Sequence, residues 1–176
     1  LDVVPVRGNV DTRLRKLAER ADGLAAIVLA RAGLQRLGRE GEAGATLDPE
    51  RFVPAPGQGT LALEGRAGDE RARAAVASIT DEQALACLLA ERALARELGA
   101  SCHTPLGAHA LPARPGGLLL RGWVGLPDGS AWVSDELRGD VAAPAALGAE
   151  VAARMSAAGA REMLERAEEM AGVAGR

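Results

Sequence analysis

The stretch that decides the fold of the N-terminal part is residues 1–38, LDVVPVRGNVDTRLRKLAERADGLAAIVLARAGLQRLG. Val3–Val6 is a short β-type run, and Val10–Arg20 has the apolar spacing of a helix. Leu24–Ala30 is apolar on both faces, as a buried parallel strand is, and Ala32–Leu37 predicts a short second helix. Strand, helix, strand and helix in this order are typical of an α/β layer.

The next stretch is a connector. Gly38–Pro56 is polar and contains Gly and Pro, and Pro54–Gly59 joins a rigid half to a flexible half, which favours a crossing or hinge between domains. Pro56–Gly59 is not a phosphate loop, because the later glycine and the Lys-Ser or Lys-Thr pair are missing. Thr60–Glu64 alternates weakly and predicts a strand.

The C-terminal part has a different pattern. Thr80–Gln83 is a capping box that predicts the clearest helix of the chain, ending at about Leu98, with apolar stripes on two sides. Three strands, a hairpin turn and two helices are expected after it, over residues 107–111, 118–125, 127–129 (turn), 131–137, 144–158 and 160–170. Strands followed by helices indicate a small α+β unit.

Composition excludes several classes of function. The 176 residues include 21 basic and 24 acidic side chains, for a net charge of −3, and only three aromatic ones. A nucleic-acid-binding protein is expected to be basic or to carry stacking aromatic residues. The longest apolar run, Leu24–Ala30, is too short to span a bilayer. Two cysteines are too few for a disulfide scaffold, which favours a reducing, cytoplasmic setting.

A candidate anion site lies where the first predicted strand ends and the first predicted helix begins. Arg7, Gly8 and Asn9 combine a guanidinium, a tight turn and the free N–H groups of a helix start. Arg13 follows in the helix, and Arg36 lies beyond the carboxyl end of the second predicted strand, where ligands bind in open α/β sheets. Carboxylates and phosphates fit equally well, and a solvated basic surface is the alternative.

The two cysteines differ in their settings. Cys87 lies within the predicted helix on an apolar stripe, which favours a buried, inert thiol. Cys102 lies in the small-residue loop GASCHTPLG, beside His103, where a thiol is accessible and open to activation; an unreactive thiol is the alternative. With His109 added, these residues have no metal-ligand spacing, so no metal site is expected.

Five segments, in their order and spacing, resemble the porphobilinogen deaminase (hydroxymethylbilane synthase) family. The loop around Cys102 is the most specific of them, and together they extend over nearly the whole chain. The resemblance implies a partial periplasmic-binding-protein-like α/β domain followed by a small domain of three antiparallel strands with helices. The five segments are Arg7–Leu14, Ala32–Gly38, Pro54–Gly59, Glu91–Leu94 and Gly99–Gly107.

The resemblance also implies a domain division. Residues 1–52 would be the later part of α/β domain 2, residues 53–78 a crossing segment that returns to domain 1, and residues 79–176 the C-terminal domain with the cofactor cysteine. The family's catalytic aspartate has no counterpart here and is expected before Leu1. Because the chain opens without Met, inside a predicted strand, we expect a fragment that is inactive alone and contains no catalytic residue.

The family is a transferase family of porphyrin, tetrapyrrole and heme biosynthesis. The resemblance implies head-to-tail joining of porphobilinogen into hydroxymethylbilane, with loss of ammonia, on a dipyrromethane cofactor bound through a thioether to Cys102. It implies a cytoplasmic monomer with no nucleic-acid or membrane partner, and it assigns no role to His103. Cofactor binding falls to Cys102, Arg7, Gly8, Asn9 and Arg13, and substrate binding to Arg7, Arg13, Arg36 and Gln58.

Two alternatives remain open. A carboxylate- or anion-binding module of periplasmic-binding-protein type, without catalysis, explains Arg7, Arg13 and Arg36 but not the loop around Cys102. A cysteine hydrolase would use Cys102 with His103, but adjacent loop residues rarely orient as nucleophile and base. An adduct of dipyrromethane size on the intact protein distinguishes the deaminase from both.

Overall fold

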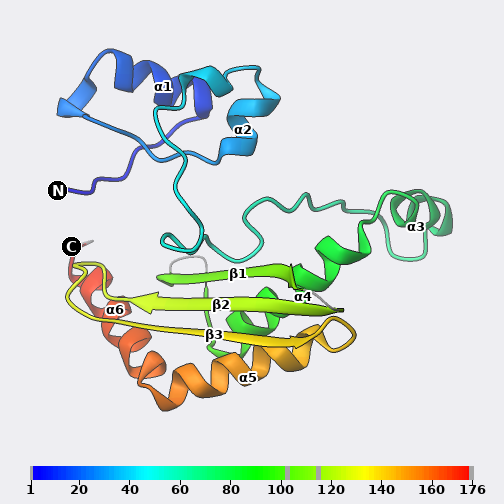
Figure 1. The fold of residues 1–176 in the computed structure, drawn as a ribbon. Coiled ribbons are helices and arrows are strands. Elements are labelled where there is room, and N and C mark those ends of the chain that lie inside the picture. Colours follow the sequence, from blue (N-terminus) through cyan, green and yellow to red (C-terminus); the bar gives the residue numbers. More distant parts are fainter. Residues whose placement is uncertain (1, 102–103, 114–115, 175–176) are drawn as a thin grey trace. The chain divides into compact units, whose positions relative to one another are not determined.

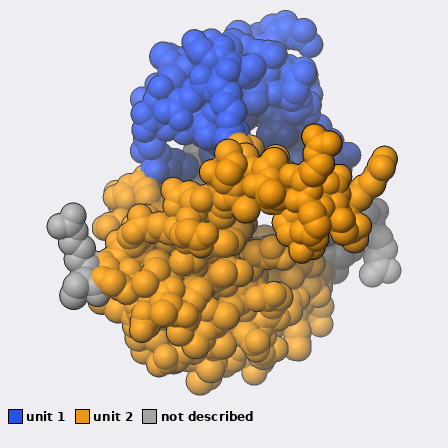
Figure 2. Space-filling model, turned by 90° about the vertical axis from the view of Figure 1, so that its right-hand side faces the viewer, with its two compact units in different colours: residues 1–47 blue, residues 48–176 orange. Residues whose placement is uncertain are grey.

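The computed structural model describes residues 2–101, 104–113 and 116–174. The chain divides into two compact units, Leu1–Leu47 and Asp48–Arg176, coloured separately in Figure 2. Each unit is a body of its own and is described by itself. In the described part of the chain, every helix is too short or too polar to cross a membrane.

Unit 1 is built from short helices (Figure 1). The predicted first helix is confirmed as α1 (Val10–Ala18), and Asn9 caps it by accepting the Thr12 N–H at 2.9 Å on its side-chain oxygen. The predicted second helix is confirmed as α2 (Arg31–Arg36), which contains the one buried apolar side chain among the described residues of this unit, Leu34. Two 3₁₀ turns, η1 (Ala21–Gly23) and η2 (Glu40–Glu42), complete it.

The strands predicted in unit 1 are wrong. Val3–Val6 and Leu24–Ala30 belong to no strand of the described chain, and Val28 is 79% exposed. A strand is stable only when neighbouring strands take up its hydrogen bonds and cover its faces, and no described residue does so here. The chain therefore has an α/β mixture of elements, while the periplasmic-binding-protein-like layer is not confirmed.

Unit 2 contains the predicted α+β unit. Three antiparallel strands in the order β1-β2-β3 form one sheet, and helices cover one of its faces (Figure 1). The largest fully buried side chains come from both layers: Leu94, Leu118, Leu120, Val124, Val151 and Met155. The bounds are β1 (Leu106–Ala113), β2 (Gly117–Gly125), β3 (Trp132–Asp140), α4 (Glu82–Glu97), α5 (Pro144–Ala157) and α6 (Ala160–Ala174).

Helix α4 begins one residue later than the capping box predicts. The N-cap is Asp81, whose carboxylate accepts the N–H groups of Gln83 and Ala84 at 2.9 and 3.0 Å. The Thr80 hydroxyl instead donates to the carbonyl oxygen of Val76 at 3.1 Å. A charged oxygen is the stronger acceptor for helix N–H groups, so the aspartate takes the cap position.

The two apolar stripes of α4 have different environments. Leu94 and Leu98 are buried in the core of unit 2, as expected. Leu85 and Leu89 belong to the apolar stripe on the other side of the helix, and both side chains are exposed. The sequence predicted that both sides of α4 are buried, and the structure confirms this for one side only.

The segment before α4 departs from its prediction. Thr60–Glu64 forms no strand, and Leu61 is 70% exposed, because no described strand pairs with this segment. A helix that the sequence analysis did not predict, α3 (Glu70–Ala77), follows it and is capped by the Asp69 side chain. Short length and weak amphipathicity leave such a helix without a clear periodic signal.

Candidate functional site

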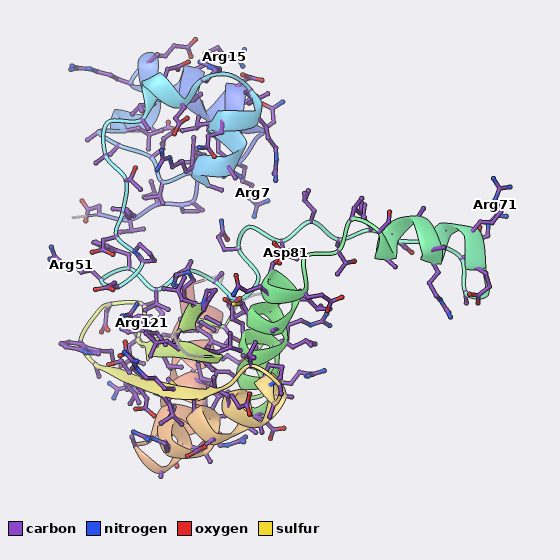
Figure 3. All side chains as sticks on the ribbon, turned by 45° about the vertical axis from the view of Figure 1, so that its right-hand side comes forward. Arg7, Arg15, Arg51, Arg71, Asp81 and Arg121 are labelled. Carbon is purple, nitrogen blue, oxygen red and sulfur yellow. The ribbon has the colours of Figure 1, made fainter. Side chains whose placement is uncertain are left out.

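Four of the predicted anion-binding residues of unit 1 lie in the first part of α1 or just before it: Arg7, Gly8, Asn9 and Arg13. Gly8 has φ +126, and a Cβ there would lie 2.8 Å from Cγ2 of Thr12, so only glycine fits. Asn9 caps the helix, and Arg13 returns to the turn, where its Nε donates to the Gly8 carbonyl oxygen at 2.8 Å. Figure 3 shows the Arg7 side chain projecting from the edge of this unit.

Lys16 joins the same turn and was missed by the sequence analysis. Its Nζ donates to the Arg7 carbonyl oxygen at 3.3 Å. The signal was available, because residues 13 and 16 are separated by three positions and so share a helix face. Two cationic side chains, those of Arg13 and Lys16, therefore reach back to the turn that contains Arg7. The helix N-terminus beside this turn favours anions.

Ion pairing separates the arginines of unit 1 into two groups. Arg39 bonds to Asp11 at 2.6 Å and to Glu42, and the hydrogen bonds to Glu42 and then Asp11 raise its pKa. In contrast, the described residues place no carboxylate within ion-pair distance of Arg7, Arg13 or Arg36. These three keep their charge available for a ligand, although unpaired surface arginines also occur elsewhere in the chain.

Arg36 lies on the other helix of unit 1. It is the last residue of α2, is exposed, and belongs to a different helix from Arg13. Its neighbour in sequence, Gln35, instead donates to Glu40 at 3.2 Å, and Arg31 bonds to the same carboxylate, which lowers the pKa of Glu40. Arg36 therefore stays a predicted second anion contact.

Gln58 lines a hollow of about 950 Å³ in unit 2. Its walls include Cys87, Glu91 and His109 among mainly apolar side chains. His109 Nδ1 is buried and has no hydrogen-bond partner in the described part of the chain. Further polar residues line the hollow beside Gln58: Thr60, Thr80, Asp81 and Gln83.

Cys87 is half-buried, and its surroundings disfavour the thiolate form. Burial first, and then the carboxylates of Glu91 and Asp81, raise the pKa of its thiol. A thiol with a raised pKa holds little thiolate at neutral pH. Its setting is that of a structural cysteine rather than of a cofactor attachment point.

Cys102 and His103 lie outside the described residues, but the residues on either side of them are described. The Ser101 N–H donates to Thr104 Oγ1 at 2.8 Å, and the Thr104 N–H donates to the Ser101 carbonyl oxygen at 3.2 Å. Ser101 is exposed, and the loop connects α4 to β1. The two residues that flank Cys102 and His103 are therefore hydrogen-bonded to each other.

Within the described ranges, no three His, Cys, Asp or Glu side chains lie close enough together to hold a metal ion.

These features define a protein of two compact units, one that carries the unpaired arginines and one of α+β type that contains Cys102 in its sequence. Two family models match the chain. Residues 1–74 match "porphobilinogen deaminase, dipyromethane cofactor binding domain", and residues 85–157, which contain Cys102, match "porphobilinogen deaminase, C-terminal domain". The chain belongs to the porphobilinogen deaminase family.

Curated relatives agree. A porphobilinogen deaminase of Thiobacillus denitrificans is 46% identical over 165 residues, which are 94% of this chain and 53% of that protein. Those of Corynebacterium diphtheriae and Mycobacterium tuberculosis are 45% and 42% identical, each over 93% of this chain and 55% of the relative. The chain thus spans about half the length of the curated relatives it matches.

Proposed function

We propose that this chain is the cofactor-bearing part of a porphobilinogen deaminase, a transferase that joins porphobilinogen units head to tail into hydroxymethylbilane and releases ammonia. The observation that carries the proposal is the agreement of two family models of one enzyme, in order, with relatives of that name at 42–46% identity. The bare anion-binding module, the alternative raised from the sequence, does not account for the match over residues 85–157.

Cys102 would hold dipyrromethane through its sulfur, and the bound group supplies the pyrrole end on which the product chain grows. The low thiolate content expected of Cys87 supports Cys102 as the attachment point. Ser101 and Thr104, bonded to each other, would hold the two ends of this loop in place.

The arginines would bind carboxylates. Porphobilinogen and dipyrromethane bear acetate and propionate groups, and guanidinium forks bind carboxylates with two parallel hydrogen bonds. Arg7 and Arg13, with the N–H groups around Gly8 and Asn9, would bind cofactor or substrate, and Arg36 and Gln58 would bind substrate. The absence of carboxylate partners for these arginines among the described residues supports this role.

The carboxylate that stabilises positive charge on the reacting pyrrole would come from a segment outside these 176 residues. One aspartate of unit 1, Asp11, supports this, because it already pairs with Arg39. We further propose the division at residues 52 and 78 into later domain 2, crossing segment and C-terminal domain, the periplasmic-binding-protein-like fold of the first part, and a cytoplasmic monomer without nucleic-acid or membrane partners.

The test compares the full-length gene product with the 176-residue chain. Each is supplied with porphobilinogen, and uroporphyrin is measured after acid oxidation. We expect turnover by the full-length protein and a rate lower by a factor on the order of a thousand for the chain, because a charge-stabilising group is missing. A full-length protein without turnover overturns the proposed function. Turnover by the chain within about tenfold of full length overturns the external carboxylate.

A further inference from the structure

The first residues of unit 2 are held against the sheet by a hydrogen bond and an ion pair. The Ala108 N–H on β1 donates to the Pro54 carbonyl oxygen at 2.8 Å. Glu50 pairs with Arg121 of β2 at 3.1 Å. Gly107 gives the segment room, since a Cβ there would lie 2.7 Å from the Val53 carbonyl oxygen. We call residues 48–57 the strap.

Glu91 of α4 fastens the end of the strap. It is 7% exposed and is the one charged side chain buried among the described residues. Its Oε2 accepts the Gly57 N–H at 2.7 Å, and its Oε1 accepts the Ala110 N–H of β1 at 2.8 Å. No Lys or Arg of the described ranges pairs with it. Burying a carboxylate without a cation is costly, so the two charge-assisted bonds are what hold it there.

The hydrogen bond from the Ala110 N–H to Glu91 also occupies a donor at the edge of the sheet. β1 is an edge strand. The N–H groups of Leu106, Ala108 and Ala110 donate to Thr104, Pro54 and Glu91, and Pro112, two residues further, has no N–H to offer. The strap and Glu91 therefore occupy the edge that would otherwise be open for pairing with another chain.

Gly57, which is bonded to Glu91, directly precedes Gln58. It has φ +70, and a Cβ would lie 3.2 Å from Leu88 Cδ1 on α4, so the backbone lies close against the helix at this point. Gln58 follows directly, and its N–H donates to the Ala55 carbonyl oxygen at 3.1 Å. The hydrogen bond between Gly57 and Glu91 therefore fixes the position of the Gln58 backbone.

We propose that Glu91 is a positioning residue: its two carboxylate oxygens clamp the Pro54–Gly59 connector to α4 and β1 and so fix Gln58 for its ligand. The connector is then a fixed part of unit 2 and not a hinge. The consequence for substrate binding rests on the proposed function of Gln58, while the clamp itself does not.

The clamp is tested by amide hydrogen exchange on the 176-residue chain with Glu91→Gln. A glutamine has one acceptor oxygen, and its NH₂ group faces the second N–H, so one buried donor loses its partner. We expect exchange at Gly57 or Ala110 to accelerate about ten- to hundredfold, while Leu120 of β2 stays protected. Glu97→Gln, exposed on the same helix, is the matched control and should change nothing. Unchanged protection at both sites in Glu91→Gln overturns the clamp.

A second variant keeps the clamp testable if Glu91→Gln fails to fold. Gly57→Ala retains the carboxylate and both N–H groups but strains the backbone at φ +70 and crowds Leu88. It should accelerate exchange at Gly57 and leave Ala110 protected. Equal acceleration at the two sites would indicate general loosening of the unit and would refute the clamp.

The positioning role is tested in the full-length enzyme by a double-mutant cycle. If Glu91 acts through Gln58, Glu91→Gln and Gln58→Ala should each raise the KM for porphobilinogen about tenfold with a smaller change in kcat, and the double variant should be no worse than Gln58→Ala alone. Additive effects refute positioning. A wild-type enzyme without turnover refutes the proposed function and leaves the exchange result on the clamp standing.

Discussion

Arg13 gives the sharpest prediction for the anion site. Its Nε is already bonded to the Gly8 carbonyl oxygen at 2.8 Å, and no described carboxylate pairs with its terminal nitrogens. Those nitrogens can therefore form a bidentate pair with a ligand carboxylate. Replacing Arg13 by Ala removes a charge-assisted contact of about 1.5–3 kcal/mol, which is roughly ten- to hundredfold in affinity or turnover.

Two other variants, Arg13→Lys and Arg71→Ala, show whether the loss in Arg13→Ala comes from a missing bidentate contact. Arg13→Lys keeps the charge but lacks the fork, and one ammonium cannot serve both Gly8 and a bidentate carboxylate, so only part of the loss should be recovered. Arg71→Ala, at an exposed arginine of α3 (Figure 3), is the control and should leave kinetics unchanged. Steady-state kinetics of the full-length enzyme with porphobilinogen measures all three. If Arg13→Ala behaves like Arg71→Ala, the anion site at the Gly8 turn is wrong.

Three further predictions concern unit 2. Because burial and nearby carboxylates raise the pKa of Cys87, iodoacetamide at pH 8 should label it about tenfold more slowly than Cys102 in the 176-residue chain produced without the cofactor. Labelling of Cys87 should still increase at pH values where an ordinary thiol is fully ionised, and equal rates at pH 8 would contradict this. Gly148→Ala places a Cβ 2.3 Å from the Ala90 carbonyl oxygen and should cost about 1–3 kcal/mol in urea unfolding, whereas Gly59→Ala, with open space around it, should cost far less; similar losses would refute the close helix crossing. Asp81→Ala should lower the free energy of unfolding by about 1 kcal/mol, because it removes the helix cap. A larger loss in Thr80→Ala would show that Thr80 is the cap, as the sequence analysis predicted.

Local signals predicted unit 2 well. The alternation of apolar residues along the strands and the turn at Pro127-Asp128-Gly129 depend on neighbours in sequence, and the structure confirms them, with the Leu126 N–H bonded to the Ala131 carbonyl oxygen at 2.9 Å. The cap of α4 was misplaced by one residue because Thr80 and Asp81 are both good capping residues. Only the geometry shows that Thr80 is already bonded to the end of α3.

Long-range partners explain what the sequence could not predict. Leu24–Ala30 has the composition of a buried strand, but burial requires neighbours that the described residues do not provide. Glu91 attracted notice only as part of a family segment, because a single helical glutamate carries no sign of burial; its role depends on Gly57 and Ala110, 34 and 19 residues away. Arg7, Gly8, Asn9 and Arg13 could be proposed as one site from the sequence because they lie close together in it.

The most direct test of the account is the covalent state of Cys102. The full-length protein, produced from its complete gene in cells that make porphobilinogen, is analysed by intact mass and then by peptide mass mapping. We predict an adduct of dipyrromethane size on the peptide that contains Cys102, and its loss in Cys102→Ser with retention in Cys87→Ser. An adduct on Cys87, or a protein that turns over porphobilinogen with no adduct at all, would contradict the account.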